Sequence, residues 1–226
     1  MAQQQCNMCS NPSKGHCKVC KCSSYCSTEC QKADWPVHKI LCNQLPKFAT
    51  PPNEAARRGI YFPVDSLTPE FVWVETQWIP PDEYEIGFEK IKQKSLYLGK
   101  DLEGKEPLAN YIHVYGNVIR SRERQDKLTI YMRDTALIDG SKPNRSIARV
   151  LRGDATFYGP WSGGMLAMKL PTLERDPASF VHMDTVDFRD VVDTFRSYGS
   201  SVKISDMSQN KKHTGPVSPF DGELTK

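Results

Sequence analysis

No stretch of this 226-residue chain approaches the roughly 20 consecutive apolar residues that a membrane-spanning helix needs. Its first ten residues, MAQQQCNMCS, also lack the basic start and the apolar stretch of a secretory signal. These two absences predict an intracellular protein without a membrane span. A hydrophobic content of 38% and a charged content of 25% exclude a disordered chain or a collagen as the whole molecule.

Cysteine is missing from the entire chain after Cys42, and all eight cysteines lie between Cys6 and that position. A disulfide framework would need an oxidising compartment, and nothing in the sequence indicates one. Closely spaced cysteines in an intracellular protein are typical of metal ligands instead. The amino-terminal segment is therefore expected to fold around metal.

Composition divides the chain into four regions. Residues 1–45 are rich in Cys and Lys and poor in aliphatic side chains, with the cysteine segment 6–42 at their centre. Residues 46–58 carry several prolines and little periodicity, which predicts a linker. A body follows over 59–207, and the polar segment 208–226 is predicted to be a disordered tail.

The body is predicted to be an α+β domain with several short strands and at least two helices. Five runs rich in β-branched and aromatic residues favour strands, namely 59–63, 70–78, 110–119, 127–133 and 165–170. Helical spacing of apolar residues favours helices over 144–152 and 187–198, with Gly153 and Gly199 placed to end them.

Two charged clusters in the body are expected to face solvent. Helical spacing groups three aspartates opposite the apolar residues of the second helix; they are Asp187, Asp190 and Asp193. A second cluster is interrupted by Glu123 and is expected in a solvated loop; it comprises Arg120, Arg122 and Arg124.

Seven cysteines and one histidine form four closely spaced pairs: Cys6 with Cys9, Cys17 with Cys20, Cys26 with Cys30, and His38 with Cys42. Eight ligands are what two tetrahedral zinc ions require. The two Cys-x-x-Cys pairs suit tight turns, whereas a spacing of four places both ligands of the other pairs on one helical face. Cys22 and His16 are left over as a bystander thiol and a loop residue.

Local signals predict two short helices in this segment. Thr28 and Gln31 have the spacing of a capping box, and Pro36 is suited to the first turn of a second helix.

The run YCSTECQKADWPVHKILC resembles the MYND-type zinc finger, whose accessory residues correspond to Tyr25, Gln31 and Trp35. The resemblance covers residues 6–42 only. It implies an interleaved cross-brace, with one zinc on Cys6, Cys9, Cys26 and Cys30 and the other on Cys17, Cys20, His38 and Cys42. It also implies a protein partner, bound through a short proline-containing peptide along Gln31 and Trp35. One finger followed by one modest body is similar to MYND finger proteins common in fungi.

The resemblance raises an enzymatic alternative, because some lysine methyltransferases carry a MYND finger within a SET domain. Those enzymes use an Asn-His motif and usually a later cysteine-rich segment, and this chain contains neither. His113, the pair His182 and Asp184, and the Gly163-Gly164 dipeptide do not amount to a catalytic or phosphate-binding motif. The sequence therefore predicts a protein that is not an enzyme.

Two further alternatives remain for the functional assignment. In one, the body binds a small ligand or is an uncharacterised enzyme, with Trp73, Trp78 and Trp161 lining a pocket and the finger purely structural. In the other, the finger is purely structural and is docked on the body so that its peptide groove is covered.

Nucleic acid is a poor candidate partner, because the formal net charge of the chain is only +3. Seven thiolates and two divalent ions would bring that charge to about zero, whereas nucleic-acid binding needs basic residues to neutralise phosphates.

Overall fold

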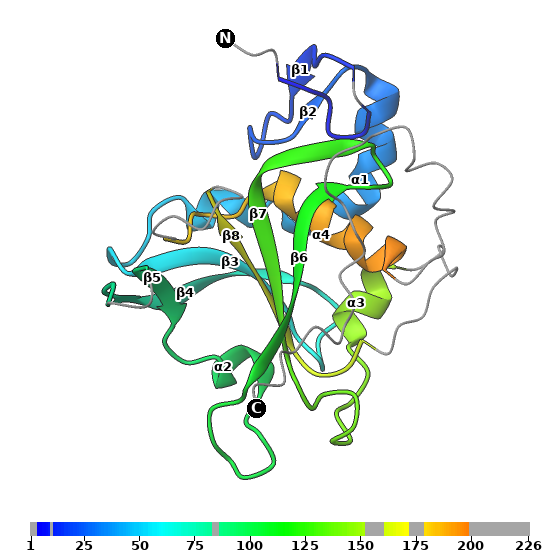
Figure 1. The fold of residues 1–226 in the computed structure, drawn as a ribbon. Helices are drawn as coiled ribbons and strands as arrows, with labels where there is room; N and C mark the ends of the chain where they lie inside the picture. Colours follow the sequence, from blue (N-terminus) through cyan, green and yellow to red (C-terminus); the bar gives the residue numbers. More distant parts are fainter. Residues whose placement is uncertain (1–3, 10, 83–85, 152–160, 172–178, 199–226) are drawn as a thin grey trace, which may run out of the picture.

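The computed structural model describes residues 4–9, 11–82, 86–151, 161–171 and 179–198. The body is built around one antiparallel sheet with the strand order β5-β4-β3-β8-β7-β6 (Figure 1). Its strands are β3 (Ala56–Phe62), β4 (Glu70–Ile79), β5 (Phe88–Ile91), β6 (Ala109–Asn117), β7 (Arg122–Arg133) and β8 (Met165–Leu170). The predicted α+β class is confirmed.

In the part of the body that the structure describes, three helices accompany the sheet: α2 (Ser95–Leu98), α3 (Arg145–Val150) and α4 (Thr185–Ser197). The helices α3 and α4 match the two predicted segments. Neither β5 nor the single-turn α2 was predicted, and β3 begins inside the segment 46–58 that the composition marks as a linker. The predicted caps Gly153 and Gly199 and the predicted tail 208–226 lie outside the described residues.

The amino-terminal finger contains a small hairpin and one long helix. The hairpin pairs β1 (Gly15–His16) with β2 (Ser24–Tyr25), and α1 runs over Thr28–Cys42 before a 3₁₀ turn, η1 (Leu45–Phe48). The prediction of two short helices is wrong, because α1 continues through Pro36. The predicted cap is also wrong: the side chain of Ser27, rather than Thr28, accepts the backbone N–H of Cys30, at 3.3 Å.

Each face of the sheet carries its own buried apolar layer. On one face α4 buries Phe188, Val191, Val192 and Phe195 against Ile60, Phe62, Leu128 and Ile130. On the other, Leu98 and Phe180 cover Val74, Leu166 and Met168. The central strand β8 is buried on both faces, which explains its nearly continuous apolar run.

The finger packs directly against the body. Leu41 and Leu45 belong to the same buried cluster as Ile60 and Phe188, so the finger and the first face of the sheet share one core. Figure 1 shows the finger above α4, with α1 beside that helix and the β6–β7 hairpin reaching toward the hairpin of the finger.

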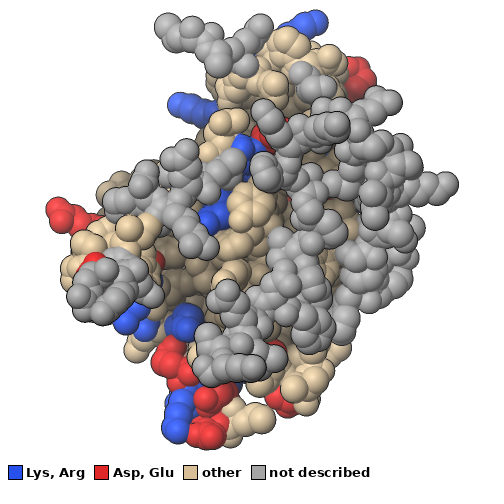
Figure 2. All heavy atoms as spheres, in the orientation of Figure 1, with Lys and Arg blue, Asp and Glu red and all other residues tan. Residues whose placement is uncertain are grey.

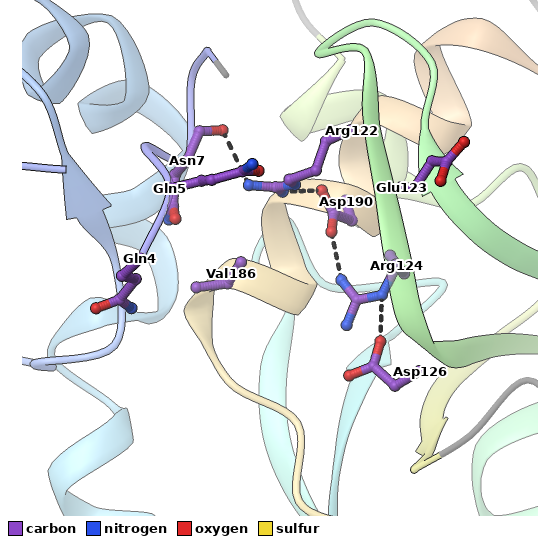
Figure 3. Close-up of a pocket in the computed structure, with 9 residues that line it drawn as sticks. All are labelled: Gln4, Gln5, Asn7, Arg122, Glu123, Arg124, Asp126, Val186 and Asp190. Atoms are coloured by element: carbon purple, nitrogen blue, oxygen red, sulfur yellow. Dashed lines mark hydrogen bonds and ion pairs between the residues drawn. The ribbon is translucent and has the colours of Figure 1, made fainter. Parts of the chain in front are cut away.

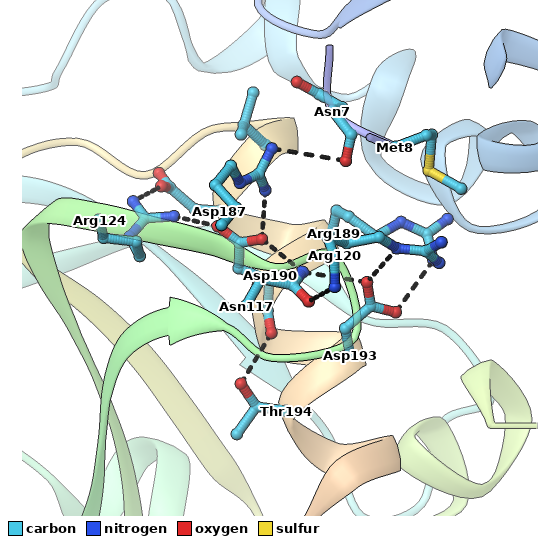
Figure 4. Close-up of polar contacts among 12 residues, drawn as sticks. Asn7, Met8, Asn117, Arg120, Arg124, Asp187, Arg189, Asp190, Asp193 and Thr194 are labelled. Atoms are coloured by element: carbon cyan, nitrogen blue, oxygen red, sulfur yellow. Dashed lines mark hydrogen bonds and ion pairs between the residues drawn. The ribbon is translucent and has the colours of Figure 1, made fainter. Parts of the chain in front are cut away.

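Both predictions of solvated charges are wrong. The three aspartates of α4 are buried, and Arg124 of β7 points at Asp187 and Asp190 (Figure 4). Arg124 pairs with Asp187 at 2.5 Å and also with Asp190, which Arg122 contacts as well. Alternation along β7 places both arginines on one face, and the α4 spacing of three presents the carboxylates to that face.

Further polar groups satisfy the remaining carboxylate oxygens of this cluster. Lys169 donates to Asp187 at 2.8 Å, and Arg120 donates to Asp193 at 3.0 Å. The amide of Asn117 bridges Asp190 and Asp193, at 2.7 Å and 3.0 Å. Burial of these charges is tolerated because each has partners on neighbouring elements.

One ion pair of this cluster crosses from the body to the finger. Arg189 of α4 donates to Asp34 of α1, with Nε–Oδ1 at 2.7 Å and Nη2–Oδ1 at 2.5 Å, and its Nη2 also reaches the backbone carbonyl of Asp34 at 3.1 Å. The side chains of Arg189 and Asp34 are 2% and 1% exposed. Water therefore cannot replace either partner, and the finger is held against α4 by a buried charge pair.

We expect Arg189→Met to lower the free energy of unfolding by about 3–5 kcal/mol, because it leaves a buried carboxylate without its cationic partner. Urea denaturation of the zinc-loaded protein measures the change. The exposed Arg149 of α3 provides the control, and Arg149→Met should leave the free energy of unfolding close to that of the wild type. Equal effects of the two substitutions would contradict a stabilising role for the junction.

Candidate metal centre

The first cluster of ligands joins the amino-terminal loop to the start of α1. It brings together Cys6, Cys9, Cys26 and Cys30, with Cys6 buried and the others half-buried. The sulfur of Cys9 lies 3.5 Å from that of Cys26 and 4.0 Å from that of Cys30, and the last two are 3.6 Å apart. Cys26 precedes the helix and Cys30 lies in its first turn.

The second cluster joins the second Cys-x-x-Cys turn to the carboxyl-terminal half of α1. It consists of Cys17, Cys20, His38 and Cys42, all of them buried. The sulfurs of Cys17 and Cys42 are 3.6 Å apart, and the Cys20 sulfur lies 3.7 Å from Nε2 of His38. The ring nitrogen that faces the cluster is therefore Nε2.

The spacing of these ligand atoms fits zinc. A tetrahedron with zinc–sulfur bonds of about 2.3 Å has edges of about 3.8 Å, close to the distances in both clusters. A disulfide would bring two sulfurs to about 2.0 Å, and all eight cysteines are free thiols. The two clusters are thus zinc-binding sites, one with four cysteines and the other with three cysteines and a histidine. They interleave along the sequence as the resemblance implies.

Backbone geometry prepares these turns for thiolates. The N–H of Met8 points at the sulfur of Cys6 at 3.4 Å. Burial raises the pKa of the Cys6 thiol, but backbone N–H groups of Met8, Cys26 and Cys9 together lower it below its ordinary value. The second turn closes at Lys21, whose φ of 61° is left-handed and whose N–H donates to the carbonyl of Cys17 at 3.0 Å.

The two leftover residues lie beside the clusters. Cys22 donates from its thiol to the backbone carbonyl of Cys20 at 3.3 Å, and exposed His16 lies in β1. Sequence reasoning missed two polar residues that face Nδ1 of His38: Ser23 Oγ at 3.2 Å and Asp34 Oδ2 at 3.9 Å. Ser23 carries no spacing signal, because only the folded chain brings it to the ring. Asp34 precedes His38 by four residues, so the helical spacing of this pair could have indicated the contact.

The three tryptophans that were candidates for a pocket in the body have different surroundings. Trp73 packs against Phe48 and His182, Trp161 packs against Phe195, and Trp78 is exposed on β4.

The polar candidates in the body also have structural partners. His182 accepts the backbone N–H of Arg58, Asp184 caps α4, and His113 contacts Thr129 across β6 and β7. A side chain at Gly164 would meet the carbonyl of Tyr97 at 2.0 Å, so the close approach of α2 explains this glycine.

A cavity of about 240 Å³ lies at the junction of finger and body (Figure 3). Gln4, Gln5 and Asn7 line it from the finger, and Arg122, Arg124 and Asp190 line it from the body. The two arginines already pair with Asp190, and none of the three candidate tryptophans lines the cavity. This cavity therefore gives no support to a ligand site formed by those tryptophans.

We expect Cys42→Ser to reduce the zinc content of the reduced protein from two ions per chain to one. Cys42 is a fully buried ligand, and serine does not supply the thiolate that the site requires. Cys22→Ser is the matched control and should retain both ions. Elemental analysis checks the numbers, and fewer than two zinc ions in the wild type would contradict the assignment.

Residues 6–42 match the MYND finger family. Dauer abnormal formation protein 25 of Caenorhabditis elegans is 51% identical over 43 residues, which are 19% of this chain and 11% of that protein. SET domain and MYND-type zinc finger protein 6 of Schizosaccharomyces pombe is 59% identical over 29 residues, or 13% of this chain and 6% of that protein. The human N-lysine methyltransferase SMYD2 is 50% identical over 32 residues, or 14% and 7%.

The chain thus spans only 6% to 11% of the length of these relatives. The methyltransferases are similar to it over the finger segment alone, and the similarity brings no catalytic domain with it. No solved structure matches the chain. Among the described residues, no helix is both long enough and apolar enough to cross a membrane. Residues 6–42 of this chain are a MYND-type zinc finger with two metal sites.

Proposed function

We propose that the finger is a peptide-binding module that recognises a short proline-containing segment of a protein partner through Gln31 and Trp35. The observation that carries the proposal is the outward position of these two residues. Trp35 is 45% exposed although it lies between buried Asp34 and the exposed Pro36 in a helix that is docked on the body. Docking of the finger therefore leaves this part of α1 accessible.

Helical geometry makes Gln31 and Trp35 one surface. They are four residues apart in α1, and both are exposed, so their side chains lie on neighbouring turns of the same face. An indole ring beside an amide suits a polyproline-like ligand, because the ring packs against proline and the amide can bond to the free backbone of the ligand.

His38, a ligand of the second metal site, lies next to Trp35. The ring of Trp35 lies 6.0 Å from the ring of His38, measured between centroids. Zinc on His38 would fix the helix under the indole, so a partner would meet a surface that is already ordered. Preorganisation of this kind favours binding because less conformational entropy is lost.

We further propose that the protein works in a reducing, intracellular compartment. Zinc binding at both sites depends on cysteines that remain free thiols, and the eight cysteines of this chain form no disulfide. Nucleic acid is disfavoured as a partner. On the face drawn in Figure 2, the visible Lys and Arg side chains are scattered and accompanied by Asp and Glu. Phosphate binding favours a continuous basic surface.

We expect Trp35→Ala to weaken binding by at least about tenfold, because a partly buried aromatic anchor carries much of the energy of a small interface. The probe is a displayed library of short proline-containing peptides, from which the strongest binder is made synthetically and titrated by calorimetry against the full chain. Zinc content should stay at two ions per chain.

Trp78→Ala is the matched control, because Trp78 is 43% exposed and lies on β4 of the body. It should bind the selected peptide with wild-type affinity. Binding that survives Trp35→Ala, or a library that yields no binder to the zinc-loaded wild type, would contradict the proposed surface.

A further inference from the structure

A residue of the body lies against the second zinc site, whose ligands all belong to the finger. Thr185 is the first residue of α4, and its buried hydroxyl lies 3.4 Å from the sulfur of Cys20 and 2.8 Å from the hydroxyl of Ser23. The hydroxyl of Ser23 lies in turn 3.2 Å from Nδ1 of His38. Four side chains therefore form a continuous polar path that leaves the metal site at His38 and returns to it at Cys20.

The chemistry of the ligands fixes the direction of this path. A histidine that binds metal through Nε2 as a neutral imidazole carries its proton on Nδ1, so His38 donates to Ser23. Ser23 can then donate its own proton to Thr185, and Thr185 can donate to the sulfur of Cys20, which is a thiolate when metal is bound. Each hydroxyl accepts one hydrogen bond and donates one, so every group in the path is satisfied.

Such a path matters because the site carries a buried negative charge. Three thiolates around one divalent ion leave a net charge of −1, and all four ligands of this site are buried. A hydroxyl that donates to a thiolate offsets part of the cost of burying this charge, and a hydrogen bond on Nδ1 orients the histidine ring. The first cluster, with four thiolates, would carry a net charge of −2, but three of its four ligands are half-buried, so water can solvate part of that charge.

We propose that Thr185 is a positioning residue of the second zinc site, which holds Cys20 directly and His38 through Ser23. The body thereby completes a metal site whose ligands all belong to the finger. The zinc on His38 and Cys42 is retained most strongly when α4 is docked, whereas the zinc of the first cluster is independent of this contact.

The test is the rate at which the reduced, full-length protein releases zinc to an excess of a chromogenic chelator. Thr185→Val keeps the shape of the side chain and removes the hydroxyl. Loss of an outer-shell partner typically costs about 10–100-fold in metal affinity, so we expect one of the two ions to leave about 10–100-fold faster. The other ion should leave at the wild-type rate. Thr185→Ser keeps the hydroxyl and should restore slow release.

Thr194→Val is the matched control, because Thr194 lies in the same helix and donates only to the backbone carbonyl of Asp190, at 2.8 Å. It should release both ions at wild-type rates. Wild-type release from Thr185→Val would overturn the proposal, and so would equal acceleration of both ions, since general destabilisation affects both sites.

Ser23→Ala interrupts the same path from the finger and keeps the proposal testable if Thr185→Val does not fold. It should accelerate the same ion, and the Thr185→Val/Ser23→Ala double variant should release that ion no faster than the quicker single variant. Additive effects would contradict a single connected path. Cobalt substitution identifies the affected ion, because only the absorption bands of the histidine-containing site should change.

Discussion

The structure depends on the contact between α1 and α4. Metal holds α1 at both ends, with Cys30 in its first turn on one site and His38 and Cys42 in its last turns on the other. Structural zinc is worth roughly 10–16 kcal/mol in small fingers, far more than the few aliphatic residues of this segment could supply. The helix that metal has fixed then presents Asp34 to Arg189 and Leu41 to the shared core.

The sequence was most informative where chemistry is local. Ligand spacing predicted eight ligands, because Cys-x-x-Cys turns and four-residue helical spacing operate within one turn of chain. The strands and the two longer helices of the body were predictable for the same reason: alternation and helical periodicity are properties of neighbouring residues. The strand β5 was not predicted, because its four residues, Phe88–Ile91, are too few to show an alternating pattern.

The failures concern contacts between residues that are far apart in sequence. Charges at helical spacing usually face water, and nothing near Asp190 indicates that Arg122 and Arg124, more than 60 residues earlier, neutralise it in the interior. The helix boundary predicted at Pro36 failed for a related reason. A proline normally ends a helix, but two metal sites and the docked α4 over-determine the path of α1, so one missing backbone hydrogen bond is tolerated.

The two sides of α1 therefore have different physical demands. The inner side, with Asp34, His38 and Leu41, is fixed by charge, metal and apolar packing, and substitutions there affect folding. The outer side, with Gln31 and Trp35, is exposed and contributes little to that framework, so substitutions there should leave the fold intact. An exposed indole such as that of Trp35 adds little to the core, so the proposal that it binds a partner can be tested by substitution without unfolding the finger. The body keeps α1 in one orientation through the buried ion pair with α4 and the shared apolar core.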